Sequence, residues 1–237
     1  MNTTAFVFAA GLGTRLYPLT ANKPKALVCY KGRPLLDIVL NKIIDAGIHN
    51  IVVNVHHFPD MIIDYLQSHS YPADIRISDE RDFLRDTAGG LRFAQPLYAG
   101  ADLLLLYNVD IVSTIDLTKF IESHISSKAD VSLAVRTRQT SRYFVFNQDD
   151  MRLCGWHNVT TGEQIMSCCP AHPIDLAFSG IHLMNAEFVN RIPEDIKLSF
   201  TPFYIRQASS AVIRGYQHQN DEWLDVGKFE ELKMYLT

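Results

Sequence analysis

The sequence predicts an α/β fold, in which a mostly parallel, Rossmann-like mixed sheet lies between helices and carries a small antiparallel β insertion. Short apolar runs alternate with segments whose apolar residues recur every three or four positions, as in strands that alternate with helices. The run Asp102–Tyr107 is apolar on both faces, which is typical of a central parallel strand. Of the 237 residues, 47% are hydrophobic and 20% are charged, so the chain can bury a sizeable core.

The first half of the chain carries the regular alternation. After an apolar run at residues 4–10, the pattern predicts helices at 34–46, 61–66 and 117–126, the first of them closed by Gly47. Strands are predicted at 51–55, 74–78, 102–107 and 131–135. This order implies right-handed crossovers between parallel strands.

The pattern changes after Thr137. Strand-like runs at 143–147 and 153–157, separated by turns, predict an antiparallel insertion of about residues 137–176 within a single domain of residues 1–237. The remaining chain is expected to form strands at 176–184 and 211–213 and helices at 186–191, 203–208 and 228–235.

The segment that follows the first strand carries the strongest functional signal. It reads GLGTRLYPLT from Gly11 and then KPK up to Lys25. Glycines let the backbone pass close to a ligand and expose its N–H groups, while Arg15 and Lys25 add fixed positive charge. This combination favours a polyphosphate. Two other glycine motifs do not fit, because the dinucleotide fingerprint needs glycine where Leu16 stands and the P-loop needs lysine where Thr14 stands.

Composition and charge limit the kinds of partner that the protein is expected to bind. The net charge is −4 and no block of lysine and arginine is present, so nucleic acid is not an expected partner. No leader peptide or membrane-spanning stretch is evident, and a cytoplasmic location is expected. The four cysteines, Cys29, Cys154, Cys168 and Cys169, lack C-x-x-C spacing, so neither a zinc site nor a disulfide framework is expected.

Two aspartates are candidate metal ligands. Asp110 directly follows the central strand, and ligands of open α/β sheets lie beyond the carboxyl ends of the strands. We therefore expect Asp110 to lie near the loop from Gly11 to Lys25. Asp225 is a second carboxylate late in the chain, although either aspartate alone could be a helix cap. The pair His56-His57 lacks a spaced acidic partner and is expected to be ordinary surface or core histidine.

Taken together, these motifs resemble those of the sugar-1-phosphate nucleotidyltransferase family. The resemblance begins with the loop from Gly11 to Lys25 and continues almost to the end of the chain. Its further elements are the turn at 86–90 (DTAGG), the strand end at 108–110 (NVD), the strand at 178–181 (FSGI) and the segment at 223–227 (WLDVG). It implies a GT-A-like fold, Mg²⁺ as cofactor, and an NTP and a sugar 1-phosphate as substrates.

Residue roles follow from the resemblance, position by position. It implies catalytic roles for Arg15, Lys25 and Asp110, and Mg²⁺ binding by Asp110 and Asp225. The nucleotide would be contacted by Ala10, Gly11, Gly13, Thr14, Arg15, Lys25, Asn54, Thr87, Gly89 and Asn108. The sugar would be contacted by Ser179 and Gly180, with Arg142 as the candidate partner of a substrate carboxylate.

Among the subfamilies, the short chain and these motifs are most similar to the N-acetylmuramate-1-phosphate uridylyltransferases of peptidoglycan recycling. UTP and N-acetylmuramate 1-phosphate are thus the favoured pair. Alternatives are mannose-1-phosphate guanylyltransferase, glucose-1-phosphate thymidylyl- or uridylyltransferase, phosphocholine cytidylyltransferase and, in another class, a non-catalytic regulatory subunit that binds nucleotide sugar. Ala88 stands where close relatives have glycine, which leaves base preference open. A monomer or small homo-oligomer without nucleic-acid or membrane partners is expected.

Overall fold

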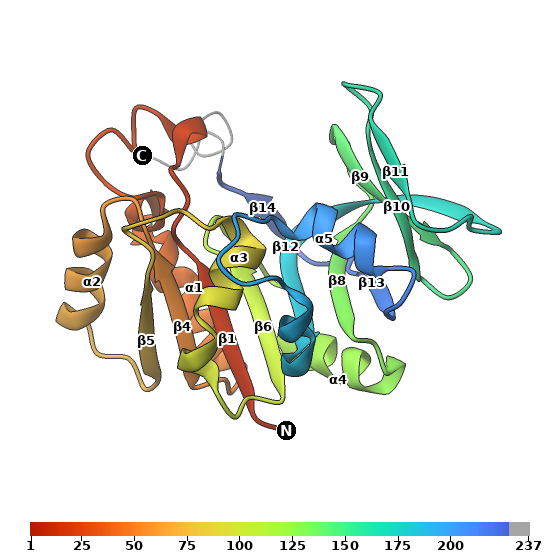
Figure 1. Cartoon of the computed structure of the whole chain (residues 1–237). Helices are drawn as coiled ribbons and strands as arrows, with labels where there is room; N and C mark the ends of the chain where they lie inside the picture. Colours follow the sequence, from red (N-terminus) through yellow and green to blue (C-terminus); the bar gives the residue numbers. More distant parts are fainter. Residues whose placement is uncertain (228–237) are drawn as a thin grey trace.

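The structure is a computed structural model and describes residues 1–227 (Figure 1). Its strands are β1 (Thr3–Phe8), β2 (Cys29–Tyr30), β3 (Arg33–Pro34), β4 (Asn50–Val55), β5 (Asp74–Asp79), β6 (Leu103–Asn108), β7 (Ile111–Ser113), β8 (Val131–Arg136), β9 (Arg142–Asn147), β10 (Leu153–Asn158), β11 (Gln164–Met166), β12 (Pro173–Asn185), β13 (Ile213–Gln217) and β14 (Trp223–Asp225). The α-helices are α1 (Leu35–Asp45), α2 (Pro59–Ser68), α3 (Asp86–Phe93), α4 (Leu117–Ser127) and α5 (Phe200–Gln207), and the 3-10 helices are η1 (Thr14–Leu16), η2 (Lys25–Leu27), η3 (Gln95–Tyr98) and η4 (Ala186–Arg191).

The main sheet combines a parallel half with an antiparallel half. Its order is β11-β10-β9-β12-β6-β1-β4-β5, and β8 and β13 extend it from β12. Neighbours from β5 to β6 are parallel, whereas β12 runs antiparallel to β6, β8 and β9. The predicted α/β class with a mixed sheet is confirmed, and every strand and helix expected between residues 34 and 135 is present.

Helices cover both faces of the sheet because successive residues of its strands point to opposite sides. In β1, Ala5 and Val7 pack in one core with α1, α2 and α4. Phe6 and Phe8 pack in a second core with α3 and α5. Figure 1 shows α3 and α5 in front of the sheet and α1 behind it. The fold therefore has three layers, and the carboxyl ends of the parallel strands lie together at one edge of the sheet.

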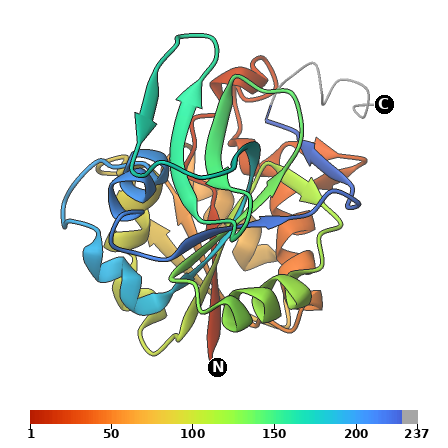
Figure 2. The same ribbon diagram turned by 90° about the vertical axis from the view of Figure 1, so that its right-hand side faces the viewer.

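The antiparallel insertion is also present. Strand β9 pairs with β10 and with the first part of β12, and β10 pairs with β11. Figures 1 and 2 show these strands projecting beyond the helices at one end of the molecule. The long strand β12 belongs to both halves, because its later residues pair with β6 and β8.

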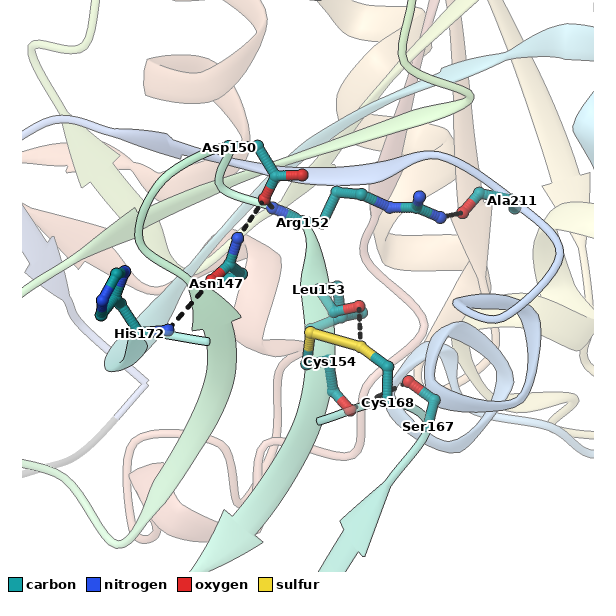
Figure 3. Close-up of a disulfide and its surroundings, with 9 residues drawn as sticks. All are labelled: Asn147, Asp150, Arg152, Leu153, Cys154, Ser167, Cys168, His172 and Ala211. Atoms are coloured by element: carbon teal, nitrogen blue, oxygen red, sulfur yellow. Dashed lines mark hydrogen bonds between the residues drawn. A yellow bond between two sulfur atoms is a disulfide. The ribbon is translucent and has the colours of Figure 1, made fainter. Parts of the chain in front are cut away.

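A disulfide in this insertion contradicts the expectation drawn from cysteine spacing. Cys154 in β10 is bonded to Cys168, which follows β11 (Figure 3). The hairpin explains the pairing: the backbone N–H of Ser167 donates to the carbonyl of Cys154 at 2.7 Å, and the Cα atoms of the two cysteines lie 4.9 Å apart. Strand register, which sequence spacing does not contain, brings them together. Cys29 and Cys169 are free thiols.

Three further elements differ between the sequence prediction and the structure. The strand predicted at 211–213 begins where that prediction ends, because Ile213–Gln217 continue the parallel register along Val131–Val135. The segment at 86–90, expected as a turn, forms the start of α3. Residues 186–191 form a 3-10 helix. The helix expected at 228–235 lies outside the described residues. Within residues 1–227, no helix combines the length and apolar composition that membrane crossing requires.

Candidate active site

A cavity of about 360 Å³ opens at the carboxyl ends of β1, β4 and β6. Its lining combines backbone, amide, carboxylate and cationic groups from these strand ends and from the loops that follow them. The lining residues are Phe8, Ala10, Gly11, Arg15, Lys25, Asn54, Leu84, Asp86, Thr87, Asn108, Asp110 and Lys197. Because ligands of open α/β sheets bind at this edge, the cavity is the candidate site for the nucleotide.

The loop after β1 is shaped by its glycines and anchored by its own hydrogen bonds. Gly13 has a left-handed conformation with φ 66°, and its carbonyl accepts hydrogen bonds from the Thr20 hydroxyl and the Leu16 N–H, both at 2.9 Å. A Cβ on Gly11 would lie 3.6 Å from the Lys25 Nζ. These contacts turn the loop back so that Lys25 lies across its first residues.

Two cations from this loop face Asp110, which is 5% exposed. The Lys25 Nζ lies 2.9 Å from the Asp110 Oδ2, and an Arg15 guanidinium nitrogen lies 3.9 Å from the same oxygen. Burial by itself would raise the pKa of Asp110, but the charge and hydrogen bond of Lys25, a backbone hydrogen bond and the charge of Arg15 together outweigh it and hold this pKa below its usual value. Asp110 is therefore an anion at neutral pH.

The second aspartate reaches the same place from the end of the described chain. β14 pairs with β7 so that Asp225 lies opposite Ile111, and the Val226 N–H donates to the Asp110 carbonyl at 2.9 Å. A Cβ on Gly227 would lie 2.5 Å from the Asp110 Oδ2, 2.8 Å from the Asp225 Oδ1 and 3.2 Å from an Arg15 nitrogen. The structure thus brings Arg15, Lys25, Asp110 and Asp225 together around one small space.

The pair of carboxylates fits the ligand preference of magnesium. Mg²⁺ favours oxygen ligands and is commonly held by one or two carboxylates together with substrate phosphates. Asp110 and Asp225 supply such a pair beside the basic loop. No group of three or more histidine, cysteine, aspartate or glutamate side chains that could hold a metal occurs within residues 1–227. His56 is engaged elsewhere, since its Nδ1 lies 2.7 Å from the Glu80 carbonyl.

Other residues expected at the nucleotide occupy three kinds of position. Asn54, Thr87 and Asn108 line the cavity, as do Ala10 and Gly11. Gly13 and Thr14 lie in the same loop as Gly11 but do not line the cavity. Gly89 lies behind the cavity in α3, where a Cβ would overlap the backbone oxygen of Ile196.

The residues expected at the sugar are divided between two places. Ser179 is fully buried, and its hydroxyl lies 2.7 Å from the His218 Nε2. Gly180 has φ 76°, and a Cβ there would lie 3.1 Å from the Asn108 amide nitrogen, so glycine permits close approach to the cavity wall. Arg142 does not line the nucleotide cavity; it lines a separate cavity of about 280 Å³ with residues of β10 and α5.

Four cavity residues were not expected from the sequence: Phe8, Leu84, Asp86 and Lys197. Asp86 carries a readable signal, because it begins the DTAGG segment whose resemblance places the adjacent Thr87 at the nucleotide. Lys197 carries none. It lies in an irregular segment that reaches the site because the Leu198 carbonyl accepts from the Ala88 N–H at 2.8 Å.

An open α/β sheet with a basic glycine loop and paired carboxylates at its carboxyl edge fits a nucleotide-binding enzyme with a GT-A-like fold. Sequence comparison agrees: the sequence model of the nucleotidyl transferase family matches residues 4–235. The chain belongs to the nucleotidyl transferase family.

Individual relatives agree with this assignment. The chain is 29% identical to the N-acetylmuramate alpha-1-phosphate uridylyltransferase of Caulobacter vibrioides, over 94% of this chain and 91% of that protein. It is 25% identical to mannose-1-phosphate guanylyltransferase 1 of Arabidopsis thaliana, over 98% of this chain but 64% of the plant protein. The crystal structure of HddC from Yersinia pseudotuberculosis complexed with GMP-PN superposes with a TM-score of 0.77 at 20% identity, covering 98% and 97% of the two chains.

Proposed function

We propose that this protein is an Mg²⁺-dependent enzyme that makes a nucleoside diphosphate sugar and pyrophosphate from an NTP and a sugar 1-phosphate. The favoured pair is UTP and N-acetylmuramate 1-phosphate. The observation that carries the proposal is the convergence of Arg15, Lys25, Asp110 and Asp225 beside a cavity at the carboxyl edge of the sheet. Family membership supports the reaction class, and the uridylyltransferase relative, which has almost the same length, supports the substrate pair.

In the proposed reaction, an oxygen of the sugar 1-phosphate attacks the α-phosphorus of the NTP. The bond from that phosphorus to the bridging oxygen breaks, and pyrophosphate leaves with the electron pair. The phosphate monoester is already an anion at neutral pH, so no general base is required. The difficulty is the repulsion between anions, which positioned cations reduce.

Each cation has a distinct position for this task. The Lys25 side chain is 14% exposed and held against Asp110, so it can contact the α-phosphate and the incoming sugar phosphate with little loss of entropy. The Arg15 side chain is 60% exposed and can reach the leaving pyrophosphate. Asp110 and Asp225 would hold Mg²⁺, which when bound would neutralise charge on the reacting phosphates.

A substrate panel tests the proposal. The purified protein is mixed with Mg²⁺ and each of UTP, GTP, dTTP and CTP against N-acetylmuramate, mannose and glucose 1-phosphates and phosphocholine, and pyrophosphate release is measured. We expect the highest kcat/KM with UTP and N-acetylmuramate 1-phosphate. A higher value for another pair would correct the substrates. No turnover with any pair would overturn the enzyme proposal and favour a regulatory subunit that binds nucleotide sugar.

Asp110→Asn tests the assignment of the site. The substitution keeps the shape but removes the charge, so we expect kcat to fall by about a hundredfold or more while the melting temperature changes little. Asp64→Asn, on the exposed face of α2, is the matched control and should leave kcat unchanged. Full activity of Asp110→Asn would remove this residue from the mechanism.

A further inference from the structure

Glu80 is a buried carboxylate that the proposed reaction does not use. It directly follows β5, at the carboxyl edge of the sheet, and is 0% exposed. None of the ion pairs among residues 1–227 includes it. A buried carboxylate without an ion pair is costly, by several kcal/mol in order of magnitude. The nearby charge of Arg85 offsets only part of this cost, since the pKa of Glu80 is still raised, so the position of Glu80 behind a substrate cavity calls for a physical explanation.

Both carboxylate oxygens of Glu80 accept hydrogen bonds. The Asn54 Nδ2 donates to Oε1 at 2.7 Å, and the Arg85 backbone N–H donates to Oε2 at 3.2 Å. Burial raises the pKa of Glu80, and the hydrogen bond from Asn54 partly offsets this rise. The neighbouring helix α3 leaves space for the carboxylate, because a Cβ on Gly90 would lie 2.6 Å from Oε1.

The first branch of this network runs through Asn54 and holds the backbone that leads into the loop from Gly11 to Lys25. The Asn54 Oδ1 accepts from the Ala9 N–H at 2.8 Å and from the Ala10 N–H at 3.3 Å. If the amide were flipped, its NH₂ would face these two donors and its oxygen would face the Glu80 carboxylate. Glu80 therefore fixes the orientation of Asn54, and Asn54 fixes the backbone immediately before Gly11.

The second branch holds the opposite wall of the cavity. The Arg85 N–H lies between Leu84 and Asp86, which both line the cavity. Arg85 is further fixed by its side chain, which contacts the Asp82 carboxylate through two hydrogen bonds of 3.1 Å. One carboxylate thus connects the loop after β1 with the loop after β5.

We propose that Glu80 is a positioning residue for the nucleotide, which acts through Asn54 and the Arg85 backbone and does not touch the substrate. The proposal rests on the proposed function, because it assigns the cavity between these two loops to the NTP. It predicts that loss of the network weakens NTP binding and leaves sugar 1-phosphate binding nearly unchanged. If the role of Glu80 were purely structural, its substitution would lower thermal stability without weakening NTP binding selectively.

Single substitutions make the first test. Glu80→Gln presents an amide where both neighbours need an acceptor, so the KM for the NTP should rise about tenfold, as for one lost hydrogen bond to a charged group. The KM for the sugar 1-phosphate should stay within about twofold. Gly90→Ala displaces the carboxylate by a different route, while its better helix propensity supports α3, and should give the same selective effect. Glu122→Gln, exposed in α4, is the matched control.

A reciprocal exchange makes the decisive test. In Asn54→Asp alone, two buried carboxylates face each other, which should weaken NTP binding more than Glu80→Gln does. In the double variant Asn54→Asp/Glu80→Gln, the carboxylate at position 54 can accept from both N–H groups and from the amide at position 80, whose oxygen can accept from the Arg85 N–H. We expect the double variant to bind the NTP at least about threefold more tightly than either single variant, the signature of direct coupling.

Direct titration with UTP by calorimetry separates this proposal from the reaction itself. If the unmodified protein binds UTP but turns over no substrate pair, the proposed function fails, and the exchange still tests the network. If the unmodified protein is active and both Glu80→Gln and Gly90→Ala bind UTP as tightly as it does, the positioning role is overturned. A double variant no better than its singles would overturn it as well.

Discussion

At the scale of single residues, Gly227 is the position where an added side chain would meet both carboxylates of the site. Its missing side chain leaves the space in which Asp110, Asp225 and Arg15 meet. A methyl group there would have to displace carboxylate oxygens that the backbone holds, since the Gly227 N–H itself donates to the Asp225 Oδ1 at 2.9 Å. The glycine is thus required for the separation between the two carboxylates.

Gly227→Ala should therefore remove activity without unfolding the protein. We expect kcat to fall by about a hundredfold, because the added Cβ pushes the aspartates away from a shared ion. The measurement is pyrophosphate release, with the melting temperature as a check of folding. The comparison variant is Asp64→Asn, the exposed control in α2. Normal activity of Gly227→Ala would contradict the proposed ion site.

Several residues of the candidate site could be predicted because they lie in the glycine loop or directly after a strand. Arg15, Lys25 and Asp110 stand in or beside such segments, and the open-sheet rule places these segments at one edge. Lys197 and Glu80 were not predictable in the same way. Their positions depend on contacts between segments far apart in the sequence, and neither lies in a motif or on a periodic face.

At the scale of elements, the length of a strand decided whether its apolar pattern could be recognised in the sequence. Strands of six residues such as β4 and β6 show their apolar pattern. Strands β7 and β14 have three residues each, too few to show a period, yet their pairing brings Asp225 to Asp110. The resemblance gave residues 86–90 as a turn, whereas they form the first residues of α3, where close packing requires Gly89.

The hairpin of β10 and β11 gives a prediction about its disulfide. Cys154 and Cys168 are 14 residues apart, and a loop of this size is stabilised by about 3 kcal/mol when closed. Replacing both with serine should lower the free energy of unfolding by a similar amount in urea titrations. Cys29→Ser, which removes a free thiol, should change it little. An unchanged free energy in the double variant would contradict the contribution assigned to this bond.

At the scale of the whole molecule, buried histidines make the stability depend on pH. Burial lowers the pKa of His182 to about 3 and that of His218 to about 4. In the unfolded chain both regain a pKa near 6.5. The unfolded state therefore binds more protons below pH 6.5, and acid favours it.

We expect the free energy of unfolding to be highest above about pH 7 and to fall as the pH decreases from about 6.5 towards 4. The slope should correspond to at least two protons taken up on unfolding, because burial also lowers the pKa of His124. Urea titrations at several pH values measure this slope, and His182→Gln should reduce it by about one proton. His172→Gln, at an exposed histidine, serves as the control. A stability that rose between pH 6.5 and 5 would contradict the neutral state of these side chains.

Strand β12 has a mechanical consequence for the catalytic cycle. Its 13 residues form backbone hydrogen bonds with β9 at one end and with β6 and β8 further along. The pairing of β12 with β8 shifts register between Phe178 and His182, and Gly180 in this interval has φ 76°. A bend at this interruption leaves the bonds to β9 and β6 intact, so we expect any movement of the insertion relative to the parallel half to pivot there.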